Sequence, residues 1–310
     1  MDPAITENVV SQSAAARDNL SLWMAGYSIV IFDYVLTFDK EVEYVWSSPW
    51  KPERILFFLN RYLPFIDIIL FSQVMLNSSI SFATCSMIAR SSVWMILIGT
   101  MVSQTIITRR TQAIWRSRRR FVWILGSITA LSFGFIVVFA AYKTVLQPLD
   151  GLDTPTISPQ IKCRISAFSF NRRTLITLLV SFLLILINEL VIFIMTVVKA
   201  REHIPKDSSP ESYVIQLYRN GVLHCGCMLA LTIINCVFVT VATPPYKTMF
   251  YPLQRALHSV FCNRFLLLIS EQQKHRRDEI AEGRSLPTTS AEGGLVLTSI
   301  RTESDDFQDI

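Results

Sequence analysis

The segment TLITLLVSFLLILINELVIFIMTVV, residues 174–198, holds a single charged residue, Glu189. About 20 apolar residues in a helix cross a hydrocarbon layer about 30 Å thick, because each residue adds about 1.5 Å. Backbone groups within lipid must hydrogen-bond inside their own segment, and a helix achieves this. The segment therefore predicts a transmembrane helix.

Similar apolar runs, each bounded by charged residues, occur on both sides of this segment. The 310-residue chain is 51% hydrophobic and 17% charged, which is more apolar than one soluble core requires. We expect an all-α, polytopic integral membrane bundle that has the lipid bilayer as its surroundings. Its six clearest helices are predicted at 20–38, 55–76, 87–108, 121–142, 174–198 and 219–241.

A weaker segment, residues 246–269, is interrupted by Arg255, His258 and Arg264. It either spans the membrane as a seventh helix or lies flat at the interface. Six arginines between Arg109 and Arg120 place the loop after the third helix inside, and hence the N-terminus outside. Seven helices would also bring the basic residues 274–277 inside, so this charge pattern favours a seventh span and a cytoplasmic C-terminus.

The domain organisation follows from these spans. We expect an external tail at 1–19, a transmembrane bundle at 20–269 and a disordered cytoplasmic tail at 270–310. The first residues lack the basic start of a cleavable signal, so the first helix is interpreted as a retained anchor. The protein is expected in the plasma membrane or an endomembrane.

Two of the six cysteines, Cys85 and Cys163, fall in external connections, where an oxidising compartment permits a disulfide. We predict that they pair, the alternative being two free thiols. Cys262 falls near the inner end of the last helix. It is interpreted as a small buried residue in preference to an S-acylation site.

Ionisable residues within the predicted helices need a partner or an aqueous cavity. Asp33 and Arg61 lie at similar depth on the first two helices, and an ion pair between them is expected. Asp67 shares one face of the second helix with Asn60 and Pro64, so this face is predicted to point into the bundle.

The deeper polar residues have two possible roles. Asp67 and Glu189 either contact a ligand, proton or ion, or form hydrogen bonds that fix helix register. Asn235 joins them if they line a polar path. These three residues, with Asp33 and Arg61, are the candidate intramembrane contacts.

Catalytic patterns are scarce. The four histidines show no two at metal-ligand spacing, and neither a phosphate-binding glycine loop nor a nucleophile elbow occurs. We therefore expect no enzyme activity, no catalytic residues, no metal and no cofactor. The basic residues are located in the loops between the predicted helices and do not indicate an anion-binding groove. We therefore expect no nucleic-acid partner.

Two motifs carry a resemblance: DYVLTFDKEV at 33–42 with Trp46, and LNRYLPF at 59–65. Together they resemble a family of basidiomycete fungal multi-pass membrane proteins with an N-terminal domain of unknown function, here covering 27–71. The resemblance departs at Gln112 and at Asn220, where the family prefers Tyr and Asp. It implies a fold and supplies no activity.

The leading functional hypothesis is a seven-helix receptor-like sensor for an unknown ligand or protein partner. The alternative is a channel or transporter whose path Asp67, Glu189 and Asn235 line. A membrane-embedded enzyme and a partner-binding structural protein remain the third and fourth hypotheses.

Overall fold

The computed structural model describes residues 3–47, 50–76, 81–115, 119–142, 144, 172–203, 213–243 and 246–281. The regular structure in these ranges is helical, and no strand occurs among them. The elements are α1 (Pro3–Glu41), the π-helix η1 (Val42–Trp46), α2 (Pro52–Leu76), α3 (Phe82–Ile114), α4 (Arg119–Ala141), α6 (Arg172–His203), α7 (Tyr213–Val241) and α8 (Tyr251–Ala281).

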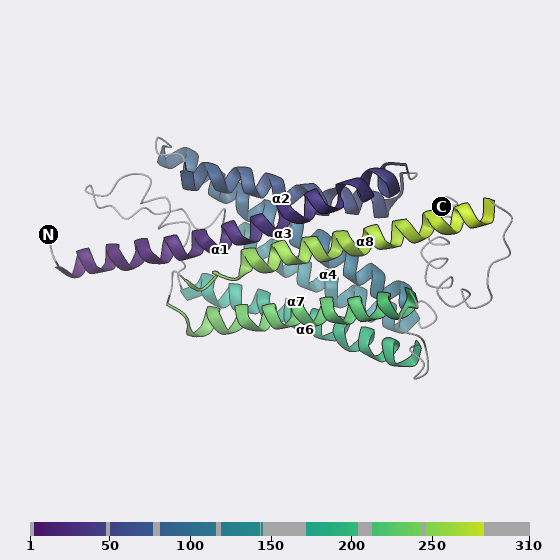
Figure 1. Ribbon diagram of the computed structural model, residues 1–310. Helices are drawn as coiled ribbons and strands as arrows, with labels where there is room; N and C mark the ends of the chain where they lie inside the picture. Colours follow the sequence, from purple (N-terminus) through teal and green to yellow (C-terminus); the bar gives the residue numbers. More distant parts are fainter. Residues whose placement is uncertain are drawn as a thin grey trace.

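The helices form a bundle in which successive helices run in opposite directions (Figure 1). The closest packing joins α2 to α3, α6 to α7 and α1 to α8. Helices α1 and α8 lie side by side and run in the same direction. Helix α1 begins at one end of the bundle, and α8 ends at the opposite end.

Six helices are long and apolar enough to cross a membrane, which confirms the all-α polytopic fold predicted from the sequence. Each overlaps one of the six predicted spans. The candidate spans are Arg17–Trp46, Pro52–Gln73, Ala83–Ile114, Arg119–Ala141, Leu175–Glu202 and Asn220–Val241.

Helix α8 corresponds to the weaker segment predicted at 246–269. It is not among the six apolar spans, yet it runs along the bundle in contact with α1, α2, α3 and α7 (Figure 1). It does not lie flat across one end. Its low hydropathy arises from polar side chains that the bundle buries, including Gln254, Arg255, His258 and Asn263.

Two predicted boundaries differ from the structure. Helix α1 begins at Pro3, within the segment expected to be a tail, although its apolar span begins only at Arg17. Helix α8 continues to Ala281, so the first part of the tail predicted at 270–310 is helical. The rest of that tail lies outside the described residues.

The bundle buries polar side chains and exposes apolar ones. Asn60 and Ser103 are fully buried, whereas Phe32 is 64% exposed and Leu131 is 72% exposed. A soluble protein of this size would place such large side chains in its core. The reversed distribution is what a lipid environment requires, because lipid accepts apolar surface and leaves buried polar groups to bond with one another.

The part of α1 around Trp23 and Tyr27 packs through aromatic rings. Trp23 stacks on Phe71 of α2 with ring centroids 4.3 Å apart, and Tyr27 meets Phe71 edge-on at 5.6 Å. Cys85 of α3 is buried against this cluster. Cys163 lies outside the described residues, so the pairing of Cys85 with Cys163 stays a prediction.

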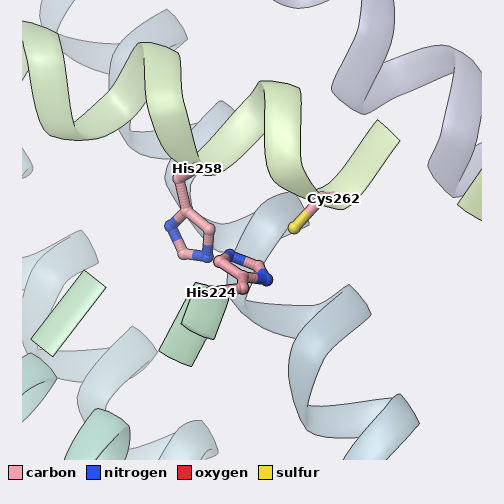
Figure 2. A group of neighbouring side chains, drawn as sticks. All are labelled: His224, His258 and Cys262. Atoms are coloured by element: carbon pink, nitrogen blue, oxygen red, sulfur yellow. The ribbon is translucent and has the colours of Figure 1, made fainter. Parts of the chain in front are cut away.

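Helices α7 and α8 meet through two histidines. His224 of α7 faces His258 of α8, and Cys262 lies one turn further along α8 (Figure 2).

Candidate functional site

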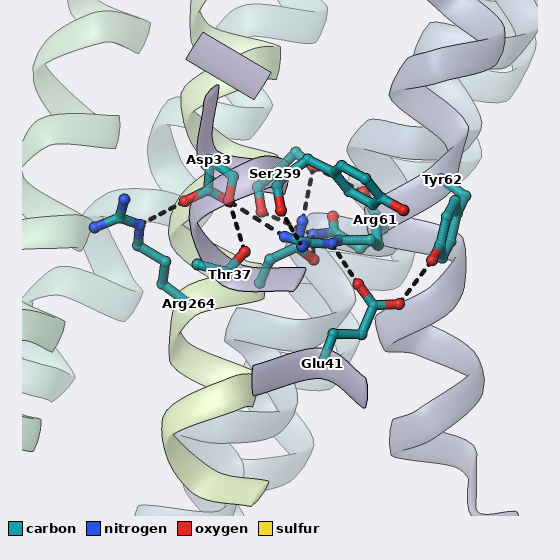
Figure 3. A network of polar contacts seen from close by, with 10 residues as sticks. Asp33, Thr37, Glu41, Arg61, Tyr62, Ser259 and Arg264 are labelled. Carbon is teal, nitrogen blue, oxygen red and sulfur yellow. Dashed lines mark hydrogen bonds and ion pairs between the residues drawn. The ribbon is translucent and has the colours of Figure 1, made fainter. Parts of the chain in front are cut away.

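Four charged side chains join α1, α2 and α8 in what we call the ionic network: Asp33, Glu41, Arg61 and Arg264 (Figure 3). Arg61 of α2 contacts the Asp33 carboxylate at 3.3 Å and the Glu41 carboxylate at 3.0 Å. Arg264 of α8 contacts the other Asp33 oxygen at 2.5 Å. The expected ion pair between Asp33 and Arg61 thus forms, as part of a larger set.

The π-helix explains how Glu41 enters this network. In a π-helix the hydrogen bonds join residues five apart, so Trp46 lies beside Glu41 on the same face. The Trp46 indole donates to Glu41 Oε1 at 3.2 Å, and the Tyr62 hydroxyl donates to the same oxygen at 2.7 Å. Glu41 is fully buried, and these donors together with Arg61 satisfy its carboxylate.

The charges of the ionic network balance, since two guanidinium groups face two carboxylates. Arg61, Asp33 and Glu41 are almost wholly buried, while Arg264 is 53% exposed. Removing one partner of a buried pair leaves an uncompensated charge and typically costs about 3–5 kcal/mol. The network therefore holds α1, α2 and α8 in one arrangement.

The α1–α8 contact repeats at a constant sequence offset. Asp33 pairs with Arg264, Lys40 with Glu271 at 3.1 Å, and Glu43 with Lys274 at 2.9 Å, and each pair is 231 residues apart. A constant offset requires two parallel helices in one register. The hydrogen bond to Glu43 raises the pKa of Lys274 above its ordinary value.

Asn60 forms a second junction, between α2, α3 and α8. Its amide nitrogen donates to the Ser259 carbonyl at 2.9 Å and to Asn263 Oδ1 at 2.7 Å, and its amide oxygen accepts from Ser103 at 2.5 Å. Pro64 lacks the N–H that would bond the Asn60 carbonyl within α2. The Ser259 hydroxyl replaces it at 2.7 Å.

A chain of hydrogen bonds, which we call the polar belt, crosses the other half of the bundle. Glu189 of α6 accepts from Gln104 of α3 at 3.0 Å and from Thr232 of α7 at 2.5 Å. Gln254 of α8 continues the belt, donating to Thr232 at 2.6 Å and accepting from Asn235 at 2.7 Å. Both Glu189 oxygens are thus used in helix-to-helix contacts.

Asp67 lies apart from the polar belt, in a cavity of about 20 Å³ between α1, α2, α3 and α8. Arg255 of α8 lines the same cavity. All three Arg255 guanidinium nitrogens and Asp67 Oδ1 are buried without a hydrogen-bond partner among the described residues. Tyr27 completes the polar lining and donates to the Asp67 carbonyl at 3.4 Å.

The position of Arg255 depends on Gly99 of α3. The guanidinium occupies the space that a β-carbon at position 99 would fill. Unsatisfied buried donors and acceptors are costly, so a cation and a carboxylate that face one cavity without bonding call for an explanation. The cavity has room for about one water molecule, and a polar ligand group would satisfy the two side chains as well.

The structure separates the five candidate contacts into three places. Asp33 and Arg61 lie in the ionic network, Glu189 and Asn235 in the polar belt, and Asp67 in the cavity. Their role as ligand contacts stays a prediction. Sequence reasoning missed Glu41, because it stands beyond the expected end of the first helix, and it treated Arg255 and His258 only as interruptions.

Comparison with known proteins places the N-terminal part of the chain. Residues 22–66 match a family of unknown function (DUF6533). No curated protein and no solved structure matches the chain. The matched stretch includes Asp33, Glu41 and Arg61, so most of the ionic network falls inside it.

Proposed function

We propose that this multi-pass membrane protein is a seven-helix, receptor-like sensor whose ligand binds in the cavity between Asp67 and Arg255. The observation that carries the proposal is a buried guanidinium facing a buried carboxylate, each with atoms that lack a partner among the described residues. Unpaired ionisable groups within a membrane bundle are expensive and mark functional sites. The proposal includes no enzymatic step.

The packing of α8 supports a seventh crossing. An even number of crossings would leave the two ends of the bundle chain on one side, whereas α1 begins and α8 ends at opposite ends (Figure 1). The arginines of the loop after α3 support an N-terminus outside and the end of α8 inside. In this proposed orientation the cavity is nearer the outer end and the ionic network nearer the inner end.

The same three helices carry both sites, which gives the proposed sensor a route for its signal. Helices α1, α2 and α8 line the cavity and also contribute every member of the ionic network. A ligand that bridges Arg255 and Asp67 would move α8 against α1 and α2. That motion would strain the ion pairs of the ionic network.

The lining of the cavity suggests the ligand class. Arg255 offers donors with a positive charge, Asp67 offers an acceptor with a negative charge, and Trp23, Val30 and Ile96 are apolar. A small zwitterion with an apolar part matches all three features, with its carboxylate on Arg255 and its ammonium on Asp67. Because the cavity is small, the flexible Arg255 side chain would have to move to admit it.

The alternative function, a channel or transporter, finds less support. It would need Asp67, Glu189 and Asn235 along one aqueous path. Glu189 and Asn235 are instead engaged with Thr232 and Gln254 in direct contacts across the bundle, and Asp67 lies in a different place. Those contacts favour the register-fixing role for Glu189 and Asn235.

Thermal unfolding of the purified protein in nanodiscs tests the proposal. The probes are L-leucine and two analogues that each lack one charge, 4-methylpentanoate and 3-methylbutylamine. We expect saturating L-leucine to raise Tm by about 2 °C or more, and each analogue to do less. Arg255→Gln should remove the shift, whereas Arg90→Gln, at an exposed position of α3, should keep it.

Two outcomes would contradict the proposal. One is the absence of any L-leucine shift in the wild type, or a shift that Arg255→Gln leaves intact. The other is an ion flux through proteoliposomes that Glu189→Gln abolishes, which would establish the channel reading.

A further inference from the structure

We propose that His224, His258 and Cys262 form a copper(I) site inside the bundle, a property separate from the ligand cavity. Their ligand atoms, one imidazole nitrogen from each histidine and the cysteine sulfur, all lie within 4.8 Å of one another. The three side chains are 4%, 2% and 1% exposed. Figure 2 shows the two histidine rings pointing toward each other between α7 and α8, with Cys262 beside them.

The helices explain why these side chains converge. His258 and Cys262 are four residues apart on α8, so they lie on one face, one turn from each other. His224 approaches from α7, and the ring centroids of the two histidines are 5.8 Å apart at an angle of 70°. A ligand pair at this spacing on one helix with a third ligand from a neighbouring helix is a common way to build a metal site.

The histidines have unused coordinating atoms. Nε2 of His224 and Nε2 of His258 are both buried without a hydrogen-bond partner among the described residues. The Cys262 thiol makes one weak contact, donating to the Ser103 carbonyl at 3.6 Å. Leaving such buried atoms unsatisfied is unfavourable. A bound ion would use the imidazole nitrogens and the sulfur at once.

The distances are close to those of a filled site. Bonds of about 2.0–2.3 Å from nitrogen and sulfur to a metal place two ligand atoms on one ion roughly 3.5–4.5 Å apart. The observed limit of 4.8 Å exceeds this range only slightly. Small rotations of the side chains would therefore suffice to bind the ion, without movement of α7 against α8.

The charges nearby select the metal. Arg255 of α8 and Arg110 of α3 both act electrostatically on this cluster, and the interior is poorly screened. A divalent ion on one thiolate and two neutral imidazoles would add a positive charge beside these guanidinium groups. Copper(I) on the same ligands adds none. Thiolate and imidazole both suit copper(I), whereas structural zinc sites are almost always four-coordinate.

Binding exchanges one proton for one metal ion. Cu⁺ replaces the proton of the Cys262 thiol, forming a copper–sulfur bond and releasing H⁺, while the two imidazoles donate lone pairs and stay neutral. No electron is transferred. The site therefore needs copper already in the reduced state.

The test is a titration of the full chain in nanodiscs with Cu(I), under anaerobic conditions and against a colorimetric copper(I) chelator. We expect about one copper per chain to be retained, with one proton released per copper. Cys262→Ser and His258→Gln should each weaken retention at least tenfold. Cys227→Ser and His275→Gln, which alter a thiol and an imidazole outside the cluster, should retain the wild-type affinity.

The proposal would be overturned by three results. These are no retained copper in the wild type, copper retained equally after Cys262→Ser, or a preference for zinc in a direct competition. Variants are compared only if they elute from a sizing column like the wild type. Proton release is measured on the wild type alone. Copper binding without proton release would show that the Cys262 thiolate is not a ligand.

Discussion

Pro64 and Ser259 show how a hydrogen-bond donor that one helix lacks is supplied by another helix. Pro64 cannot donate to the Asn60 carbonyl within α2, and the Ser259 hydroxyl of α8 does so at 2.7 Å. An unsatisfied carbonyl is especially costly in lipid, where water does not reach it. The two residues therefore act as one unit, although 195 positions separate them in the sequence.

We predict that Ser259→Ala lowers the free energy of unfolding by about 1–3 kcal/mol, because the Asn60 carbonyl loses its donor. The same change should cost less in a Pro64→Ala background, where alanine supplies the N–H within α2. Reversible unfolding in mixed detergent micelles measures both effects as a double-mutant cycle.

Ser91→Ala is the matched control for this cycle. Within the described part of the chain, the Ser91 hydroxyl donates to the Met87 carbonyl of its own exposed helical turn and to no other residue, so its loss should have little effect. An equal cost of Ser259→Ala with and without Pro64 would show that the two residues are not coupled.

Some of these residue contacts could be predicted from the sequence, and others could not. The pair of Asp33 and Arg61 could be predicted, because opposite charges at one depth of adjacent helices need a partner within the bundle. His258 and Cys262 carry a usable signal in their spacing of four. His224 had none, since periodicity gives the face of a helix and does not give the neighbour that this face meets.

At the scale of elements, the contact between α1 and α8 depends on charge order. Lys40, next to the end of α1, pairs with Glu271 in the second half of α8, and the lysine side chain is 53% exposed. Exposed pairs of this kind contribute about 0–1 kcal/mol each. Their value here is therefore directional: they specify which register the two parallel helices adopt.

We predict that Lys40→Glu lowers Tm, because it places a carboxylate opposite Glu271. Adding Glu271→Lys should recover most of the lost Tm, because the ion pair then forms again with its two charges exchanged. Thermal unfolding in detergent at low and high salt measures this, and the effect should shrink as salt screens the charges. A double variant no more stable than Lys40→Glu would show that the register does not depend on this pair.

The six apolar helices could be located from the sequence because lipid-facing surface must be apolar along its whole length. Helix α8 was harder, for a physical reason. It is surrounded by α1, α2, α3 and α7, so Gln254 and Asn263 form hydrogen bonds within the bundle and His258 is buried there, away from lipid. A mean hydropathy is lowered by these polar residues whether their side chains face lipid or the interior of the bundle.

For the whole molecule, the number of crossings is the property that can be measured most directly. We predict that a membrane-impermeant maleimide labels Ser81→Cys from outside intact cells. Ser47→Cys, Glu202→Cys and Asp278→Cys should react only after permeabilisation, because seven crossings bring the ends of α1, α6 and α8 to the inner side.

The unmodified chain provides the background for this labelling, since it keeps its native cysteines. Asp278→Cys is the decisive position. External labelling there, with Ser47→Cys still protected, would mean that the last helix does not cross.

The constant offset of 231 residues between the ion pairs of α1 and α8 has a mechanical consequence. Because the three pairs share one spacing, a slide of α8 by a helical turn, about 5.4 Å, parts all of them together. The two helices should thus resist sliding as one cooperative unit, because a stimulus that moves α8 along α1 has to break the three pairs together.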